Sequence, residues 1–200
     1  DGLWQIYELD LATLEQKRLS DGTGNDFDPL PSPNGDLVGY HSIREGLAAR
    51  VFIMNADGSD PKPISAAGSD ARNLSWSSDQ SLLAYNSDAD GDQDIYVYEL
   101  ATELTRQLTD NTTTDVAPTW LCSAPTILWT SNATSDQVTP NDVDDIYSTN
   151  ALPIDAPALN VRDEANRLTD NEHQNRYPQN FPPVEFGSRE SQQPPALRGR

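Results

Sequence analysis

The chain has 200 residues, of which 36% are hydrophobic, and a formal net charge of −19 at neutral pH. Such an acidic surface repels phosphate backbones and anionic membranes, so nucleic-acid binding is not expected. The single cysteine, Cys122, excludes an internal disulfide, and no apolar run is long enough to span a bilayer. Residues 1–4 lack the basic and apolar regions of a signal peptide, so none is expected in this chain.

In chain order, the first predicted element is a short strand that recurs along the sequence. Its four copies, here named strand c, begin 44 to 51 residues apart, at 5–9, 50–54, 94–98 and 145–149. A period of about 40–50 residues is typical of propellers and solenoids. A strand d follows each copy and ends on an aliphatic residue and a hydroxyl: Leu19-Ser20, Ile64-Ser65, Leu108-Thr109 and Leu168-Thr169.

Two further strands, a and b, precede each later copy of strand c. Strand a has one recurring site, which holds Pro31, Trp76 and Trp120. Strand b is a short apolar run, predicted at 37–42, 82–87, 126–131 and, in degenerate form, 183–188. Such a run between turns is typical of a strand buried on both faces. Its fourth place is aromatic, and we expect these rings to pack between blades: Tyr40, Tyr85, Trp129 and Phe186.

These strands predict an all-β fold, a β-propeller of four-stranded antiparallel blades. A c–d pair opens the chain, full a–d sets follow, and an a–b pair comes last. If the terminal pairs join, residues 4–189 form a single closed domain of four blades. The alternative is an open fragment of a larger propeller with six to eight blades. Residues 190–200 are predicted to be a polar tail or a linker.

The motifs resemble the TolB-like, WD40-like β-propeller repeat. The resemblance covers about residues 4–189 and rests on motifs at 31–35, 54–58, 94–96 and 108–109 that keep a shared register. Pro31 departs from the usual Trp, and Leu121-Cys122 departs from the usual Ser-Pro. The resemblance implies a periplasmic, extracellular or envelope-associated location. It also implies a protein-binding role, or a place beside the catalytic domain of a prolyl-oligopeptidase-type hydrolase.

The sharpest candidate site is an acidic loop just before the third copy of strand c. Alternating carboxylates suit Ca²⁺, a hard cation that takes six to eight oxygen ligands. The predicted metal ligands are Asp88, Asp90, Asp92 and Asp94. An EF-hand interpretation would place Glu99 at the twelfth position, but Gln93 stands where that loop needs glycine. The alternative is a solvated loop in which Asp and Gly serve the turn.

A second candidate is the loop 132–144, an insertion that lengthens the third full repeat. Longer loops on a rigid scaffold tend to carry binding function. We therefore expect contacts with a protein partner from Asp136, Asn141, Asp142 and Asp144. The alternative is drift in a tolerant surface loop.

Acidic residues also recur just before strand a. Asp26, Asp70 and Asp115 are expected to cap backbone amides in the turn, and the alternative is that they point to the mouth of the central channel.

Catalytic patterns are sparse. The sequence has no Gly-x-Ser-x-Gly elbow, and His41 and His173 lack metal-ligand spacing. Cys122 is expected to be a small buried hydrophobe. The sequence therefore predicts a non-enzymatic propeller that binds a protein partner or belongs to an extracytoplasmic assembly. The alternatives are a propeller module of a hydrolase, and a glycan-active enzyme with two carboxylates facing across the channel.

Overall fold

The computed structural model describes residues 2–44, 48–122, 125–132, 145–150 and 166–168. These residues form three antiparallel sheets of four strands and one sheet of two strands. The two-stranded sheet, here named the half-blade, consists of β1 (Tyr7–Leu9) and β2 (Gln16–Arg18). No helix occurs in these ranges, so these residues contain no helix that could cross a membrane.

Each full sheet is a blade whose strands follow one another in chain order. Blade 1 consists of β3 (Asn25–Pro31), β4 (Leu37–Ile43), β5 (Arg50–Asn55) and β6 (Lys62–Pro63). Blade 2 consists of β7 (Ala71–Trp76), β8 (Leu82–Ser87), β9 (Asp94–Glu99) and β10 (Leu104–Gln107). Blade 3 consists of β11 (Asp115–Trp120), β12 (Thr126–Ser131), β13 (Asp145–Asn150) and β14 (Asn166–Arg167). The predicted order of strands a to d is therefore confirmed in all three blades.

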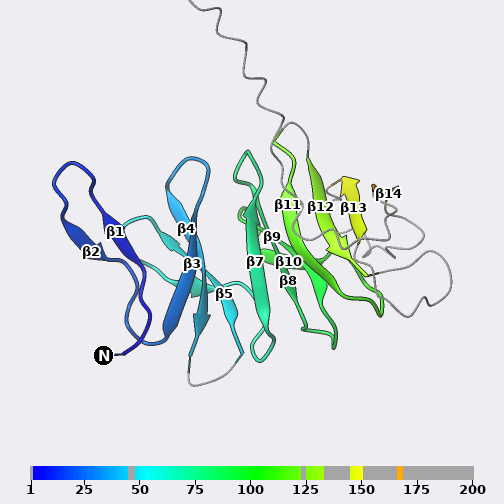
Figure 1. Ribbon diagram of the computed structural model, residues 1–200, viewed down its shortest axis with the longest axis horizontal. Helices are drawn as coiled ribbons and strands as arrows, with labels where there is room; N and C mark the ends of the chain where they lie inside the picture. Colours follow the sequence, from blue (N-terminus) through cyan, green and yellow to red (C-terminus); the bar gives the residue numbers. More distant parts are fainter. Residues whose placement is uncertain (1, 45–47, 123–124, 133–144, 151–165, 169–200) are drawn as a thin grey trace, which may run out of the picture.

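The blades stand side by side in chain order and form an open fan, with the half-blade at one end and blade 3 at the other (Figure 1). The described residues are thus a partial propeller that does not close into a ring. The strand predicted at 183–188 and the tail predicted at 190–200 lie outside the described residues. The pairing of Ile6 with the Phe186 region stays a prediction for that reason.

The hydrophobic core lies between neighbouring blades rather than inside one sheet. One cluster joins β9 to β11 and β12, and includes Ile95, Trp120 and Trp129. A second joins blades 1 and 2, and a third packs Ile6 of the half-blade against Tyr40 of blade 1. Strand b is buried along most of its length, as its apolar pattern predicts. Three of the recurring rings are confirmed as core: Tyr40, Tyr85 and Trp129.

The hydroxyl that ends each strand d has a structural role. The backbone N–H of Ile6, Val51 and Ile95 donates to the hydroxyl of Ser20, Ser65 and Thr109, respectively, over 2.9–3.0 Å. These hydroxyls are buried, so an unpaired N–H there would be costly. The recurring aliphatic–hydroxyl pair therefore ties strand d to the start of strand c.

The recurring tryptophans connect successive blades. The indole Nε1–H of Trp76 donates to the carbonyl oxygen of Leu30, and that of Trp120 donates to the carbonyl oxygen of Ser75, both over 3.1 Å. Both acceptors lie on strand a of the preceding blade. Pro31 occupies this site in blade 1 and offers no donor of this kind.

Each strand a also contains a bulge. The pairing register with strand b shifts at the same place in β3, β7 and β11. A residue with positive φ stands at each shift: Asp28 at 53°, Asn73 at 57° and Ala117 at 56°. The bulge changes which face the following side chains occupy.

Candidate acidic site and exposed half-blade

Three of the four predicted metal ligands come together between β8 and β9. One carboxylate oxygen from each of Asp90, Asp92 and Asp94 lies within 4.8 Å of the other two. Asp94 is the first residue of β9 and is fully buried, whereas Asp90 is exposed on the loop and Asp92 is half-buried. The amide of Gln107 donates to Asp90 over 2.5 Å and to Asp94 over 3.1 Å. The loop and the neighbouring strands thus gather these three carboxylates at one end of blade 2.

Asp88 has a different role. Its Oδ1 accepts the backbone N–H of Asp70 over 2.6 Å, which ties the loop before β9 to the loop before β7. Asp88 is absent from the group formed by the other three carboxylates among the described residues. Asp88 therefore lies outside the group that the other three carboxylates form, and its role as a metal ligand stays a prediction. Its carboxylate holds two loops together instead.

The EF-hand interpretation is also wrong. Asp94 and Glu99 are the two ends of one strand, β9, where an EF-hand requires a helix. At about 3.3 Å per residue, they lie about 16 Å apart along the strand. Glu99 accepts a hydrogen bond from the Thr102 hydroxyl at the far end. It therefore lies too far away to share an ion with Asp94.

The environment of Asp94 disfavours its charged form. Burial raises the pKa of the Asp94 carboxyl to about 8, and the nearby carboxylates of Asp90, Asp115 and Asp92 add to this, while the Thr109 hydroxyl opposes it. Burial also raises the pKa of Asp92, with Asp90 and Asp110 adding to the shift. The cluster holds more negative charge than its protein neighbours neutralise, so it favours uptake of either a proton or a cation.

Asp115 adjoins this cluster from blade 3, a relationship that sequence analysis missed. Its backbone N–H donates to the carbonyl oxygen of Gln93 over 2.6 Å, and its carboxylate is fully buried. Burial raises the pKa of Asp115 to about 6, opposed by hydrogen bonds from Ser131, Asn111 and Thr109. The only sequence signal was the repeat itself, which places Asp115 at the blade boundary.

One of the acidic residues before strand a accepts a backbone N–H, although not from its own turn as predicted. Asp70 Oδ1 accepts the backbone N–H of Ala49 over 3.1 Å. Asp26 is buried, yet neither of its carboxylate oxygens has a hydrogen-bond partner among the described residues. Asp115 Oδ2 accepts from the side-chain amide of Asn111 rather than from the backbone. Capping is therefore the wrong interpretation for Asp26 and Asp115.

The described histidine is buried beside an aspartate. His41 Nδ1 lies 3.2 Å from Asp28 Oδ2, and the imidazole is nearly inaccessible to solvent. Burial lowers the pKa of His41, with the Asp28 carboxylate opposing the shift. Asn86 holds the corresponding place in blade 2 and accepts a hydrogen bond from Asn73. Blades 1 and 2 therefore share a pair of polar residues at this place. His173 lies outside the described residues.

Cys122 is exposed, so its predicted burial is wrong. It follows Trp120 just beyond the end of β11, where the chain turns toward β12. The loop residues Asp136, Asn141, Asp142 and Asp144 lie outside the described residues, and their role stays a prediction.

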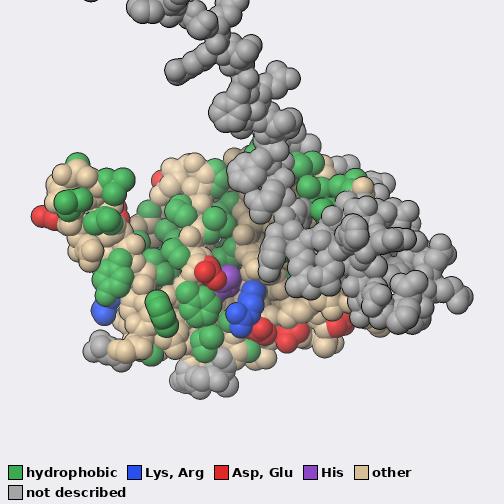
Figure 2. All heavy atoms as spheres, in the orientation of Figure 1, with side chains coloured by type: hydrophobic (Ala, Val, Ile, Leu, Met, Phe, Trp, Pro, Cys, Tyr) green, Lys and Arg blue, Asp and Glu red, His purple; other side chains and the backbone are tan. Residues whose placement is uncertain are grey.

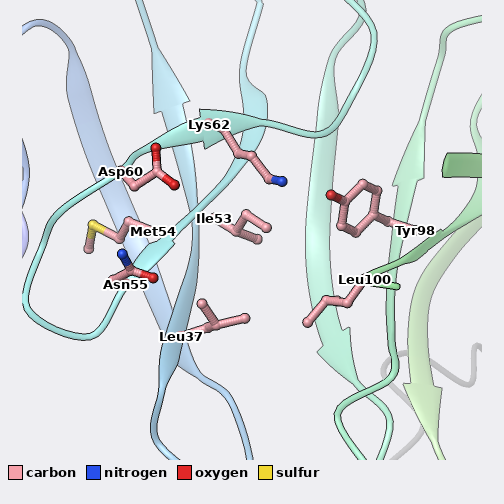
Figure 3. A pocket seen from close by; sticks show the side chains of 8 residues that line it. All are labelled: Leu37, Ile53, Met54, Asn55, Asp60, Lys62, Tyr98 and Leu100. Carbon is pink, nitrogen blue, oxygen red and sulfur yellow. The ribbon is translucent and has the colours of Figure 1, made fainter. Parts of the chain in front are cut away.

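A cavity of about 190 Å³ opens between blades 1 and 2 (Figure 3). Leu37 and Leu100 line it from opposite blades, and Lys62 and Tyr98 point toward one another across it. The Lys62 amine is 2.5 Å from the carboxylate of Glu103 and lies 6.0 Å from the Tyr98 ring centre. These contacts link the two blades, and we assign the cavity to inter-blade packing.

The half-blade exposes apolar side chains that its counterparts bury. Tyr7 on β1 is 58% exposed, whereas Phe52 and Tyr96, at the same place on β5 and β9, are 5% and 8% exposed. Hydrophobic side chains gather over the β1–β2 hairpin in Figure 2. In the full blades, strand c pairs with strand b on one side, but β1 pairs only with β2 among the described strands. Among the described residues, the half-blade therefore presents an open edge and an apolar surface.

Comparison with known proteins gives a consistent result. A family model described as the TolB beta propeller domain matches residues 1–139. A putative TolB from Agrobacterium tumefaciens aligns over 87% of this chain and 58% of its own, with a TM-score of 0.64 and 18% identity. TolB from Acinetobacter baumannii aligns over 82% and 37%, with a TM-score of 0.56 and 18% identity. The tricorn protease aligns over 82% and 19%, with a TM-score of 0.58 and 14% identity.

No curated protein matches the chain. The chain spans less than two thirds of the length of these three solved structures. At such low identities, the likeness to them shows the fold alone.

Proposed function

Because the chain belongs to the family of TolB beta-propeller domains, we propose that it is a non-enzymatic binding module that engages a protein partner. The observation that carries this proposal is the open half-blade. The module is also proposed to belong to a periplasmic, extracellular or envelope-associated assembly, which is the location that TolB-like propellers imply.

The three full blades indicate what an occupant of the half-blade looks like. In each of them, strand b pairs antiparallel with strand c and places an aromatic ring directly opposite an aromatic ring of strand c. The pairs are Tyr40 and Phe52, Tyr85 and Tyr96, and Trp129 and Tyr147. Tyr7 holds the equivalent place on β1 and lacks such a neighbour among the described strands. The occupant would be an extended strand with an aromatic side chain opposite Tyr7, and we propose that the partner supplies it.

Unpaired strand edges are templates for added strands, since their backbone groups need partners and their apolar face needs cover. Tyr7 and Leu9 lie on the same face of β1, and Leu9 is 47% exposed. A partner strand would bury both side chains and satisfy the free edge of β1 at once.

A photo-cross-linking amino acid at position 7 tests the proposal in the source cells. A matched control carries the same group in place of Leu104, an exposed apolar residue on β10 of the complete blade 2. The expected result is an adduct with a second polypeptide from position 7 and none from position 104. Equal labelling at the two positions, or only an adduct within the chain at residues 183–188, would overturn the proposal.

The loop predicted to contact the partner belongs to the same proposal. Alanine at Asp136, Asn141, Asp142 and Asp144 together is expected to lower the yield of the position-7 adduct. A full yield would remove this loop as a contact. Fractionation of the source cells tests the proposed location.

A second candidate function is an accessory propeller of a hydrolase. It is favoured by the likeness to the tricorn protease, although that likeness shows only the fold. The discriminating observation is the complete gene. A downstream segment with a Gly-x-Ser-x-Gly elbow would decide for the hydrolase.

A further inference from the structure

We propose that Asp90, Asp92 and Asp94 bind a Ca²⁺ ion at the end of blade 2, with the buried hydroxyl of Ser87 facing the same site. This inference is independent of the protein-binding role proposed above. It concerns a different edge of the molecule and different residues.

The spacing of the carboxylates suits this ion. Oxygens that ligate one Ca²⁺ at 2.3–2.6 Å lie at most about 5.2 Å from one another. The three carboxylates already have oxygens within 4.8 Å of each other. Mg²⁺ demands near-ideal octahedral geometry and usually keeps several waters, so a group of three protein carboxylates suits Ca²⁺ better. An all-oxygen ligand set also disfavours zinc and copper.

Ser87 supplies an independent observation. It stands directly opposite Asp94 in the register of β8 and β9, so the two side chains project from the same face, with Cβ atoms about 4.5–5.5 Å apart. Ser87 is 1% exposed, and its hydroxyl oxygen has no hydrogen-bond partner among the described residues. A buried hydroxyl without a partner is unfavourable, and a ligand beside Asp94 would satisfy it.

A further buried oxygen lies in the same region without a partner among the described residues. Oδ2 of Asp92 is shielded from solvent and is unpaired among the described residues. Native structures pair most buried oxygens, so unpaired oxygens gathered at one place point to a missing positively charged partner.

The balance of charge supports a cation as that partner. Gln107 donates to Asp90 and Asp94, Thr109 donates to Asp94, and both of these side chains are neutral. None of the described ion pairs joins Lys, Arg or His to any of the three carboxylates. Backbone carbonyls of the loop and water would complete the six to eight ligands that Ca²⁺ takes.

Calcium titration calorimetry and melting curves test the site, with CaCl₂, MgCl₂ or a chelator added to the metal-stripped protein. Asp92→Asn is the main variant, since its side chain lies on the loop and is not fully buried. Asp57→Asn is the matched control, because it removes the same charge from an exposed turn of blade 1. Asp94→Asn would extend the test if it folds.

Ca²⁺ is expected to bind and to raise the melting temperature, since binding to the folded state alone stabilises it by mass action. Asp92→Asn should weaken Ca²⁺ binding at least about tenfold, and Asp57→Asn should leave it unchanged. The proposal is overturned if millimolar Ca²⁺ gives no heat and no shift. It is also overturned if both variants respond like the unaltered protein, since the ion would then only screen the net charge of −19.

Discussion

Gly58 lies against the backbone of Leu19. A Cβ added to Gly58 would stand 2.4 Å from the carbonyl oxygen of Leu19 and 2.9 Å from its Cα. Gly58 is in the turn between β5 and β6, and Leu19 follows β2, so this contact joins blade 1 to the half-blade. Lys17 Nζ donates to the carbonyl oxygen of Asp57 in the same region, over 2.9 Å.

Gly58→Ala should therefore destabilise the protein more than Gly35→Ala. Both glycines have positive φ, +89° and +80°, and each alanine carries the cost of the left-handed conformation, about 1–2 kcal/mol. Only at Gly58 does the new Cβ meet backbone atoms, whereas nothing lies within 4 Å at Gly35. The measurement is the free energy of unfolding in urea, and equal losses would contradict the contact.

Thr109→Val should cost about 1–3 kcal/mol of unfolding free energy. Valine keeps the volume of threonine but leaves the buried N–H of Ile95 without its acceptor and removes the hydroxyl that donates to Oδ1 of Asp94. Thr109→Ser should recover most of the loss, because serine holds this place in the half-blade and in blade 1. Thr102→Val, on the exposed turn before β10, serves as the control and should change stability by less than about 0.5 kcal/mol. A loss of similar size at Thr102 would contradict the role of Thr109.

Trp120→Phe should destabilise the join between blades 2 and 3 by about 1–3 kcal/mol. The change removes the indole N–H that donates to the carbonyl oxygen of Ser75, and it leaves space in a buried cluster. Trp4→Phe is the control, because Trp4 is 76% exposed. Urea denaturation of both variants gives the comparison. An unchanged midpoint for Trp120→Phe would show that the indole bond adds nothing to the join.

His41→Asn should reduce the loss of unfolding free energy that the protein shows as the pH falls from about 7 to 5. Burial lowers the pKa of His41 in the folded chain, so below about pH 6.5 the unfolded chain takes up this proton first. The contribution of neutral His41 is therefore present at neutral pH and is lost as the pH falls through the folded-state pKa. The Asp28 carboxylate works against this loss, and Arg72 adds to it.

The check on His41 is the free energy of unfolding at about pH 7, 6 and 5 for both proteins. Asparagine suits the site because Asn86 occupies it in blade 2. The unaltered protein should lose more stability between about pH 7 and 5 than the variant. Parallel profiles would show that His41 does not titrate in this range.

Much of the fold could be predicted from the sequence, because the residues that connect strands and blades recur at the same place in each repeat. In each copy that the structure describes, the hydroxyl after strand d accepts the N–H at the start of strand c, and the tryptophan of strand a donates to the preceding blade. Their spacing therefore locates the strands even where the apolar pattern is short. The sequence left both a closed ring of four blades and an open fragment as alternatives, because its pattern does not define the angle between neighbouring blades.

The candidate site was predictable in part. The alternation of aspartates locates Asp90, Asp92 and Asp94, but the tie between Asp88 and the amide of Asp70 joins two loops that are distant in sequence. The approach of Asp115 to Asp94 likewise depends on the packing of blade 3 against blade 2. The predicted burial of Cys122 was wrong because β11 ends at Trp120, so Cys122 lies beyond the strand.

The indole bonds give the row of blades a direction. Trp76 and Trp120 each donate to the blade before their own. The first strand of each of these blades therefore supplies the donor that links it to its predecessor. A tandem duplication of such a unit would copy the joint together with the blade. A propeller of this kind can therefore lengthen by gene duplication without any new pair of complementary surfaces having to evolve.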